Sequence, residues 1–479
     1  MSYKKTVFVS GHFNILHPGH LRLLRAAKEY GSHLIVAVES DRLAGNTAHL
    51  PEELRLEGIQ SHGLVDEAFI ADEPIETIIN KLRPDVVVKG KEHESRQNVE
   101  TEILLAYGGR LVFSSGESSF SSIDLIRKEF QLQDHNSINI PNDYLQRHSI
   151  IKTRLVKILN DFSNLNICVI GDLIIDEYIT CDAIGMSQED PTIVVTPVDS
   201  TRFIGGAGIV AAHAAGLGAK VQFVSISGSD DSRNFALERL NEAKVNAKLI
   251  LDDSRPTTLK QRYRSKGKSL LRVSHLHQGS ISKELQKKII DLMEVALDNV
   301  NLLVFSDFNY GCLPQPMVDQ IIAIAKERNI YLAADSQSSS QVGDISRFKD
   351  MDLITPTERE ARISTRNNED GLVVLAEQIQ KQSKAANILL KLGEEGLLIH
   401  ASNSDKDAWL TDRISALNSA VKDVAGAGDS LLIASAMTLA CGGSIWEAAL
   451  LGSLAAAVQV GRVGNTPMVN SELLRELGV

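Results

Sequence analysis

Residues 6–31 combine a short apolar run, a loop with three histidines and two glycines, and an amphipathic helix. The run TVFV is typical of a buried strand, and apolar residues recur at helical spacing in LRLLRAAKEYG. The next stretch, SHLIVAVESD, predicts a second buried strand. A strand, a loop, a helix and another strand in this order favour a parallel sheet, so the chain begins as an α/β protein.

The loop itself, GHFNILHPGH, carries the first candidate site. We expect His17 just before the helix and His20 in its first turn, where unpaired backbone N–H groups and the helix dipole favour an anion. Imidazoles there could donate hydrogen bonds to a triphosphate and to the charge that develops when its α–β bond breaks. The alternative is structural, with one histidine capping the helix and the other exposed.

The first 130 residues or so resemble the nucleotidyltransferase family that carries H-x-G-H, especially its cytidylyl- and adenylyltransferases acting on phosphorylated sugars and polyols. PEELRLEGI, VDEAFIADEPIETIINKLRPDVVVKGKEH and SSFSSIDLIRK carry the resemblance. It implies a Rossmann-like fold with His17, His20 and Lys89 as catalytic residues. It also implies a nucleotide site formed by Gly11, Phe13, Asn14, Arg55, Ser121 and Ser122. Asn14 stands where the nearest relatives have Asp, and Ile123 replaces a Thr.

Length and composition restrict the class of protein. A chain of 479 residues predicts two or three domains. The net charge of −11, without a basic stripe, argues against nucleic acid as a partner. No apolar run reaches the roughly 20 residues that span a bilayer, and the N-terminal residues lack the apolar region of a secretory signal. The four cysteines have no zinc-ligand spacing, so we expect a reduced, cytoplasmic protein without membrane contact.

The chain divides near residues 131–150, which are polar, rich in asparagine and interrupted by a proline. We predict a first domain over 1–135, a linker over 136–150 and a second domain over 151–479. In the second domain the strand-like runs VQFVSIS, NLLVFSD, IYLAAD, DLITP and NILLKLG alternate with helical segments. That alternation again predicts an α/β fold.

A second phosphate loop lies in VKDVAGAGDSLLIASAMTLACGG. Gly426, Ala427 and Gly428 can bring bare backbone close to an anion at the start of a helix. A carboxylate beside such a loop would repel the anion unless it has a chemical role. We therefore predict that Asp429 is the general base that deprotonates a hydroxyl attacking a γ-phosphate. The alternative is that Asp429 caps the helix and the glycines form a plain turn.

Residues 151–479 resemble the ribokinase-like sugar kinases through GDLIID, RFIGGAGIVAAHAAGLGAKVQFVSISGSDD, TPTERE, KLGEEG and DVAGAGDS. The resemblance implies a ribokinase-like domain with a small β lid, and Mg²⁺ and ATP as cofactors. It places the nucleotide at Lys391, Gly393, Gly396, Gly426, Ala427 and Gly428. It places the sugar at Asp172, Asp176, Gly205 and Gly206, and gives Glu360 an indirect role at Mg²⁺.

The same resemblance implies that the basic stretch LKQRYRSKGKSLLRVSH faces the substrate. Lys260, Arg262 and Arg272 could bind a sugar phosphate there, although a solvated pair of strands is the alternative. YITCDAIGMSQEDPTIVVTPVDSTRF could form the lid sheet, through which the resembling kinases pair. We therefore expect a homodimer or a higher homo-oligomer.

One branch of both families fits best. MSQEDPTIVV, LVFSDFNYG and VGRVGNTPM resemble the kinase half of the bifunctional heptose 7-phosphate kinase/heptose 1-phosphate adenylyltransferase family, and VDEAFI with LRPDVVVKG resembles its other half. The order of the halves is reversed in this chain. The resemblance implies phosphorylation of a heptose 7-phosphate-like sugar at the anomeric position, then nucleotidyl transfer to the sugar 1-phosphate with release of pyrophosphate. Both steps would use Mg²⁺, and the nucleotidyl donor could be ATP or CTP.

Departures from the family leave alternatives open. Ala425 replaces a Thr, Ile209 an Asn, and Ser336-Gln337 a Pro-Lys pair. If Ile209 and Gln337 face the sugar, the substrate differs from the usual manno-configured heptose 7-phosphate. The first alternative is a transferase for a polyol or sugar phosphate whose degenerate kinase domain is a scaffold or regulator. The second is a nucleotide-sensing protein without enzymatic activity.

Overall fold

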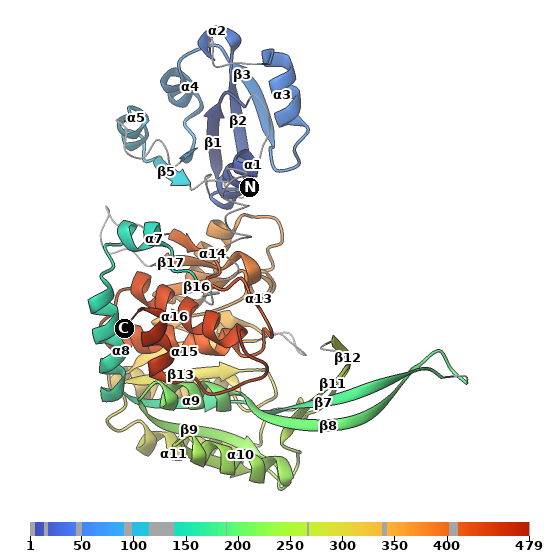
Figure 1. The fold of residues 1–479 in the computed structure, drawn as a ribbon. Coiled ribbons are helices and arrows are strands. Elements are labelled where there is room, and N and C mark those ends of the chain that lie inside the picture. The colour runs from blue at the N-terminus through green and yellow to red at the C-terminus, as the bar shows by residue number, and fades with distance from the viewer. Residues whose placement is uncertain are drawn as a thin grey trace. The chain divides into compact units, whose positions relative to one another are not determined.

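The computed structural model describes residues 5–13, 18–44, 50–90, 98–114, 138–187, 189–265, 268–337, 343–401 and 411–478. The chain forms two compact units. The first comprises Met1–His135 and Asn367–Gln378, and the second comprises Asn136–Arg366 and Ile379–Val479. Each unit has its own α/β sheet, which confirms the predicted fold class (Figure 1).

The first unit is built on a five-stranded parallel sheet in the order β3-β2-β1-β4-β5. Its strands are β1 (Thr6–Gly11), β2 (His33–Glu39), β3 (Glu67–Ala71), β4 (Val86–Gly90) and β5 (Arg110–Ser114). Its helices are α1 (Pro18–Glu29), α2 (Asp41–Ala44), α3 (Glu52–Gln60), α4 (Ile75–Leu82) and α5 (Glu100–Leu105).

The central strand β1 is apolar on both faces because helices cover both sides of the sheet. Val7 and Val9 pack with Leu24 of α1 in one core cluster. Phe8 points to the other face and packs with Ile79 of α4. Fully buried strands of this kind read as continuous apolar runs, as TVFV does.

The second unit contains a nine-stranded sheet in the order β10-β9-β6-β13-β14-β15-β16-β17-β18. These strands are β6 (Asn166–Gly171), β9 (Lys220–Ser227), β10 (Asn246–Leu251), β13 (Leu302–Asp307), β14 (Tyr331–Ser336), β15 (Leu353–Ile354), β16 (Asn387–Lys391), β17 (Leu397–Ala401) and β18 (Thr411–Ile414). The pairs from β10 to β16 are parallel, and β17 and β18 run antiparallel. The strands predicted from VQFVSIS to NILLKLG are therefore confirmed.

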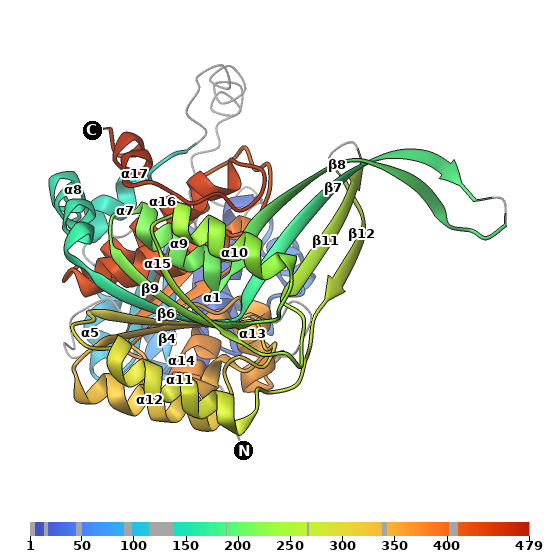
Figure 2. The same cartoon turned by 90° about the horizontal axis from the view of Figure 1, so that it is seen from below.

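Helices cover both faces of this sheet, with α9, α15 and α16 on one face and α11 and α12 on the other (Figure 2). The helices of the unit are α7 (Asn142–Arg147), α8 (Lys152–Asp161), α9 (Ala207–Gly216), α10 (Asp231–Glu242), α11 (Lys283–Ala296), α12 (Gln315–Glu327), α13 (Glu358–Thr365), α15 (Ala427–Ala440), α16 (Ile445–Val460) and α17 (Asn470–Glu476). Helix α14 (Leu372–Ser383) is shared, because its residues up to Gln378 belong to the first unit. Short 3₁₀ turns are η3 (Phe162–Asn164), η4 (Ile345–Arg347) and η5 (Gly393–Glu395). Helices α9, α15 and α16 are buried along almost their whole length, because they form the main apolar core with the sheet.

A separate four-stranded sheet, in the order β12-β11-β7-β8, forms the lid that the sequence predicts. Strands β7 (Leu173–Met186) and β8 (Ile193–Gly206) form a long antiparallel ribbon, and β11 (Thr258–Ser265) and β12 (Lys268–His275) form a hairpin beside it. The ribbon extends well beyond the body of the unit (Figures 1 and 2).

Part of the expected linker belongs to the second unit. Residues 142–147 form α7, and Tyr144 is only 1% exposed within the main core. The Tyr144 hydroxyl donates to the carbonyl oxygen of Trp446 at 3.0 Å. The polar composition of 136–150 concealed this packing, because a few apolar side chains are enough to anchor a short helix. The first boundary between the two units lies between His135 and Asn136.

Among the described residues, no helix is long and apolar enough to cross a membrane.

Candidate functional site

The glycine-rich loop of the second unit leads directly into α15. Gly426 precedes the helix with φ 75°, the left-handed region that favours glycine. A Cβ atom on Gly426 would lie 2.4 Å from Oδ1 of Asn465, and one on Gly428 would lie 3.2 Å from Nζ of Lys391. The loop is therefore tightly surrounded, and Lys391 is the cation beside it.

Asp429 lies in the first turn of α15 and is 5% exposed. Its position inside the helix excludes the capping alternative, because Gly426 is the residue at the N-cap. Nε2 of Gln337 donates to Oδ1 of Asp429 at 3.0 Å. Burial and the neighbouring Asp335 raise the pKa of Asp429 to about 7, against the opposing charge of Lys391. A carboxyl that titrates near neutral pH is suited to general-base catalysis.

Lys391 ends β16 and reaches across to Asp335 at the end of β14. Its Nζ lies 3.1 Å and 2.9 Å from the two carboxylate oxygens of Asp335. Burial raises the pKa of Asp335 to about 6 although Lys391 opposes the shift. Burial also disfavours the charged lysine, but the carboxylates of Asp335 and Glu360 outweigh it and raise the pKa of Lys391. Lys391 therefore stays charged beside the anion loop.

Glu360 contributes charge and also a structural bond. Its carboxylate accepts from the backbone N–H of Thr357 at 2.7 Å, which completes a capping box at the start of α13. The described residues contain no cluster of three or more His, Cys, Asp or Glu side chains able to hold a metal ion. The surplus of carboxylates around Lys391 fits an ion carried in on nucleotide phosphates, which is how Mg²⁺ is commonly bound.

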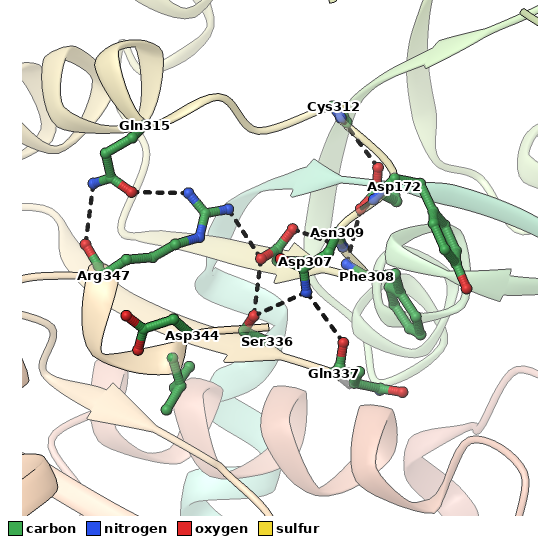
Figure 3. A network of polar contacts seen from close by, with 12 residues as sticks. Asp172, Asp307, Phe308, Asn309, Cys312, Gln315, Ser336, Gln337, Asp344 and Arg347 are labelled. Atoms are coloured by element: carbon green, nitrogen blue, oxygen red, sulfur yellow. Dashed lines mark hydrogen bonds and ion pairs between the residues drawn. The ribbon is translucent and has the colours of Figure 1, made fainter. Parts of the chain in front are cut away.

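The resemblance places Asp172 at the sugar, but its carboxylate is occupied by backbone. It accepts from the N–H groups of Phe308 at 2.8 Å, Tyr310 at 3.3 Å and Cys312 at 3.2 Å (Figure 3). Burial, with the nearby Asp307, raises the pKa of Asp172 to about 6. Asp172 therefore holds the 308–312 loop, and a role in binding sugar hydroxyls stays a prediction that its contacts do not favour.

Asp176 is the better placed of the two predicted sugar-binding carboxylates. Its Oδ2 accepts from Nδ2 of Asn465 at 3.3 Å, and burial raises its pKa against Arg262 and Lys260. A Cβ atom on Gly205 would lie 2.4 Å from Oδ2 of Asp176. Only glycine leaves room for the carboxylate there.

Gly206 meets a similar constraint. Its φ is 57°, and a Cβ atom on it would lie 2.4 Å from the carbonyl oxygen of Asp172. The glycine pair of RFIGGAG thus allows β8 to pass close to β7, beside the carboxylates of the site.

The cations of the lid lie above these carboxylates. Nζ of Lys260 lies 5.4 Å and 5.1 Å from the ring centres of Phe308 and Tyr310. The Arg262 guanidinium lies 5.3 Å from the Tyr178 ring and 3.8 Å from Asp176. Arg262 and Arg272 are paired in the β11–β12 register, although Arg272 is exposed. The predicted basic stretch is thus a hairpin that brings Lys260 and Arg262 toward the site.

Two predicted nucleotide-side glycines also meet a backbone constraint. Gly393 has φ 62° and Gly396 has φ 94°, and a Cβ atom on Gly396 would lie 2.1 Å from the carbonyl oxygen of Ile414. The K-L-G-E-E-G turn therefore requires glycine at these places for its shape. Binding of a nucleotide by this turn stays a prediction.

The departure at Ile209 does not face the sugar. Ile209 is fully buried in the apolar core of α9. The hypothesis that this position changes substrate preference loses its structural basis, because the side chain contacts other apolar groups. Gln337, the second departure, donates to the carboxylate of Asp429.

In the first unit, β1 ends at Gly11 and α1 begins at Pro18, so His20 lies in the first turn as predicted. Between them Phe13 adopts φ 47°, and its ring centre lies 5.1 Å from that of His20. Asn14, His17, Ser121 and Ser122 lie outside the described residues.

Lys89 and Arg55 have specific partners. Nζ of Lys89, near the end of β4, lies 2.6 Å from Glu100 and donates to Oδ1 of Asn98 at 3.1 Å. The Arg55 side chain is fully buried and binds Asp41 at 2.6 Å and the carbonyl oxygen of His12, also at 2.6 Å. Arg55 therefore shapes the loop after β1, and its predicted contact with nucleotide phosphates would require it to leave these partners.

Sequence reasoning missed three residues that the fold brings to the second site. Asn465 reaches Asp176, and the amide of Gln459 donates to the carbonyl oxygens of Ala425 and Gly464. Tyr178 donates to Asp423 at 2.9 Å. Asn465 lies in VGRVGNTPM, which resembles the kinase family, and this resemblance was the one signal that could have found it. The fold was needed to bring Gln459 and Tyr178 to the site.

The arrangement of the second unit defines a class of protein: an α/β kinase with a glycine loop, a buried carboxylate and a β lid. Residues 164–472 match the model of the pfkB family of carbohydrate kinases, and residues 8–112 match the cytidylyltransferase-like family. The chain belongs to the pfkB family of carbohydrate kinases.

Curated relatives support this assignment. The chain is 28% identical over 320 residues to the bifunctional protein HldE of Desulfatibacillum aliphaticivorans, covering 66% of this chain and 64% of the relative. It is 30% identical over 322 residues to the bifunctional protein HldE of Sulfurimonas denitrificans, covering 66% and 65%. The matches thus span less than two thirds of the length of these relatives.

Solved structures share the fold of the second unit. Arabidopsis thaliana ribokinase complexed with ribose and ATP matches with a TM-score of 0.51 at 18% identity, over 66% of this chain and 99% of that one. Escherichia coli phosphofructokinase-2 in complex with potassium matches with a TM-score of 0.54 at 16% identity, over 66% and 98%. At these identities the comparison establishes the fold alone.

Proposed function

We propose that this protein is a bifunctional sugar-activating enzyme. The second unit phosphorylates the anomeric hydroxyl of a heptose 7-phosphate-like sugar with MgATP. The first unit then joins the sugar 1-phosphate to a nucleotide and releases pyrophosphate. The observation that carries the proposal is the buried Asp429, which stands between the glycine loop and the charge pair Asp335–Lys391.

In the kinase step, Asp429 takes the proton of the sugar hydroxyl while the hydroxyl oxygen bonds to the γ-phosphorus. The bond between that phosphorus and the bridging oxygen breaks, and ADP leaves. Lys391 and the N–H groups at the start of α15 stabilise the charge on the transferred group. Mg²⁺ supplies further positive charge on the nucleotide phosphates when it is bound.

In the transferase step, a phosphate oxygen of the sugar 1-phosphate attacks the α-phosphorus of a nucleoside triphosphate. His17, together with Lys89 and with His20 at the start of α1, stabilises the departing pyrophosphate. No general base is required, because the attacking phosphate is already ionised. ATP is the proposed nucleotidyl donor, and CTP is the alternative.

The distal phosphate of the sugar is assigned to the lid. Lys260 and Arg262 face Asp176 and the 308–312 loop, so they place positive charge at the entrance to the sugar site. We assign Arg272 to the edge of the same site, because it pairs with Arg262 in the hairpin.

The order of the two domains is proposed to be reversed with respect to the bifunctional heptose enzymes. The curated matches cover about 320 residues, close to the span of the kinase model, and leave over a third of each relative unmatched. A chain with both domains in the same order as its relatives would match along more of their length. We place the domain boundary at 135–136. We assign the protein to the cytoplasm because both proposed reactions consume nucleoside triphosphates.

The lid is also the proposed dimer contact. Ile184, Met186 and Val198 on the β7–β8 ribbon are 69%, 61% and 62% exposed. Apolar side chains on both strands of a projecting ribbon are suited to burial against a second copy. Sedimentation of the full chain should give a dimer that Ile184→Lys converts to a monomer.

Separate assays test the main proposal. ADP formation is measured with ATP and a panel of sugar phosphates, and pyrophosphate release with sugar 1-phosphates and ATP or CTP. Both activities are expected, with a heptose phosphate preferred. Pyrophosphate release without ADP formation would favour the degenerate-kinase alternative, and the absence of both would favour a sensing role.

A further inference from the structure

We propose that Gln337 positions the carboxylate of Asp429 for proton transfer and that its neutral amide is the feature that suits it to this task. The inference rests on the proposed kinase activity. Gln337 follows β14, and its Nε2 donates to Oδ1 of Asp429 at 3.0 Å. Asp429 lies on α15, so this hydrogen bond connects the base on the helix to the segment that follows strand β14.

The backbone of Gln337 is held from both sides. Its N–H donates to the carbonyl oxygen of Asp307 at 2.8 Å, and its carbonyl oxygen accepts from Nδ2 of Asn309 at 3.2 Å (Figure 3). Asn309 adopts φ 60°, a conformation that Asn tolerates better than most residues. The amide of Gln337 therefore extends from a fixed position.

Asp307 anchors this support beneath the strand ends. Its carboxylate is 1% exposed and accepts from Oγ of Ser336 at 2.9 Å and from Nη2 of Arg347, also at 2.9 Å. It also accepts from the N–H of Asn309 at 3.1 Å. These contacts, visible together in Figure 3, fix the segment that carries Gln337 through one buried carboxylate.

An amide can serve both forms of the base. It donates through Nε2 to Oδ1 of the ionised carboxylate, and it can keep donating to that oxygen when a proton is bound to the other one. A lysine could only donate and would favour the ionised form by its charge. Gln337 can therefore hold Asp429 before and after the proton arrives.

The other charges facing Asp429 come from four strands. Asp335 on β14 and Asp176 on β7 raise its pKa, and Lys391 on β16 and Lys260 on β11 lower it. The two carboxylates and the two cations act in opposite directions, burial is the largest cause, and the pKa of Asp429 rises to about 7. A further charge at position 337 would disturb this balance in a direction set by its sign.

The bond to Gln337 also distinguishes the two oxygens of the base. Because Oδ1 is bound to the amide, we assign Oδ2 as the oxygen that receives the sugar proton. The proton passes from the hydroxyl to Oδ2 as the hydroxyl oxygen bonds to phosphorus and ADP departs.

The experiment compares Gln337→Lys, Gln337→Met and Gln337→Glu in the full chain. Sugar-dependent ADP formation is measured from pH 5 to 9, with kcat and KM separated for ATP and sugar. We expect the acid limb of kcat/KM to move down by about one pH unit in Gln337→Lys, because an added cation favours the ionised base. The acid limb should move to higher pH in Gln337→Met, because Asp429 loses a hydrogen-bond donor. It should move further up in Gln337→Glu, because an added negative charge disfavours the ionised base.

We also expect kcat of Gln337→Met to fall about 10–100-fold with little change in KM for ATP, because a misplaced base slows chemistry more than binding. Gln380→Met is the matched control, because it removes a hydrogen bond from a glutamine amide to the carbonyl oxygen of Ala386 elsewhere in the unit. It should change neither the acid limb nor kcat.

Two failures can be told apart. If the unaltered protein forms no ADP with any sugar phosphate, the proposed kinase function is wrong. If it is active but the three acid limbs coincide, or follow an order unrelated to charge, Gln337 is not the partner of the base. Thermal melting of each variant establishes that it is folded, and the Lys and Glu variants test the order even where the Met variant is unstable.

Discussion

The two units each place a lysine near the end of a parallel strand and pair it with a buried acid. Lys89 near the end of β4 meets Glu100 at 2.6 Å, and Lys391 at the end of β16 meets Asp335 at 2.9 Å. The second site has a carboxylate in the first turn of the helix behind its phosphate loop, namely Asp429 in α15, whereas the first turn of α1 has no acidic residue. The difference matches the proposed nucleophiles: a sugar hydroxyl must lose a proton, whereas a sugar phosphate attacks as it is.

The largest effect is expected from removing Asp429, the carboxylate that distinguishes the two sites. Asp429→Asn should lower sugar phosphorylation by about 10³-fold or more, because the amide cannot accept the hydroxyl proton. Pyrophosphate release from a supplied sugar 1-phosphate should be unchanged. Both are measured on the same preparation, and loss of both activities in folded protein would contradict independent sites.

The next effect concerns the lysine near the end of a parallel strand, which the two sites share. Lys89→Met should slow pyrophosphate release by about 10²–10³-fold, because developing charge loses a donor. Phosphorylation should remain. Lys81→Met is the matched control, since Lys81 is exposed and pairs with Glu73 on the surface. Equal losses in the two variants would show that Lys89 acts only through general electrostatics.

A third effect, on stability and not on rate, tests whether the units are separable. A fragment of residues 136–479 should fold cooperatively and phosphorylate sugar, whereas a fragment of 151–479 should be less stable by about 3–5 kcal/mol because it lacks buried Tyr144. Tyr144→Phe in the longer fragment is the control, since it removes only the hydroxyl. Equal urea midpoints for the two fragments would place the boundary after α7.

The smallest effect is on the pH dependence of stability. The folded pKa values of Asp335 and Asp429 are raised to about 6 and 7, so folding favours their protonated forms. Their contribution to stability is therefore present below pH 4 and is lost as pH rises toward 7. Asp429→Asn should lose less stability than the unaltered protein between pH 4 and 7.5, by on the order of 1–3 kcal/mol. Parallel melting curves for the two proteins over that range would contradict the raised pKa.

The sequence predicts the strands well because buried parallel strands are continuous apolar runs, as NLLVFSD is in β13. It also predicts that Asp429 enters a helix behind a glycine loop. It cannot predict that Asp172 holds backbone N–H groups, because those groups lie in the 308–312 loop, far along the chain. Nor can it show that Ile209 is core, since the neighbours of α9 come from other elements.

The order of strands in the larger sheet has a consequence for synthesis on the ribosome. Strand β6 is made first among the strands of its unit, yet it pairs with β9 on one side and β13 on the other. At about 5–20 residues per second, the residues between β6 and β13 take on the order of ten seconds to make. During that interval the nascent chain holds an apolar strand without its second neighbour. The strands of the first unit, which precede residue 115, have by then already been made, whereas the residues 367–378 of that unit come later.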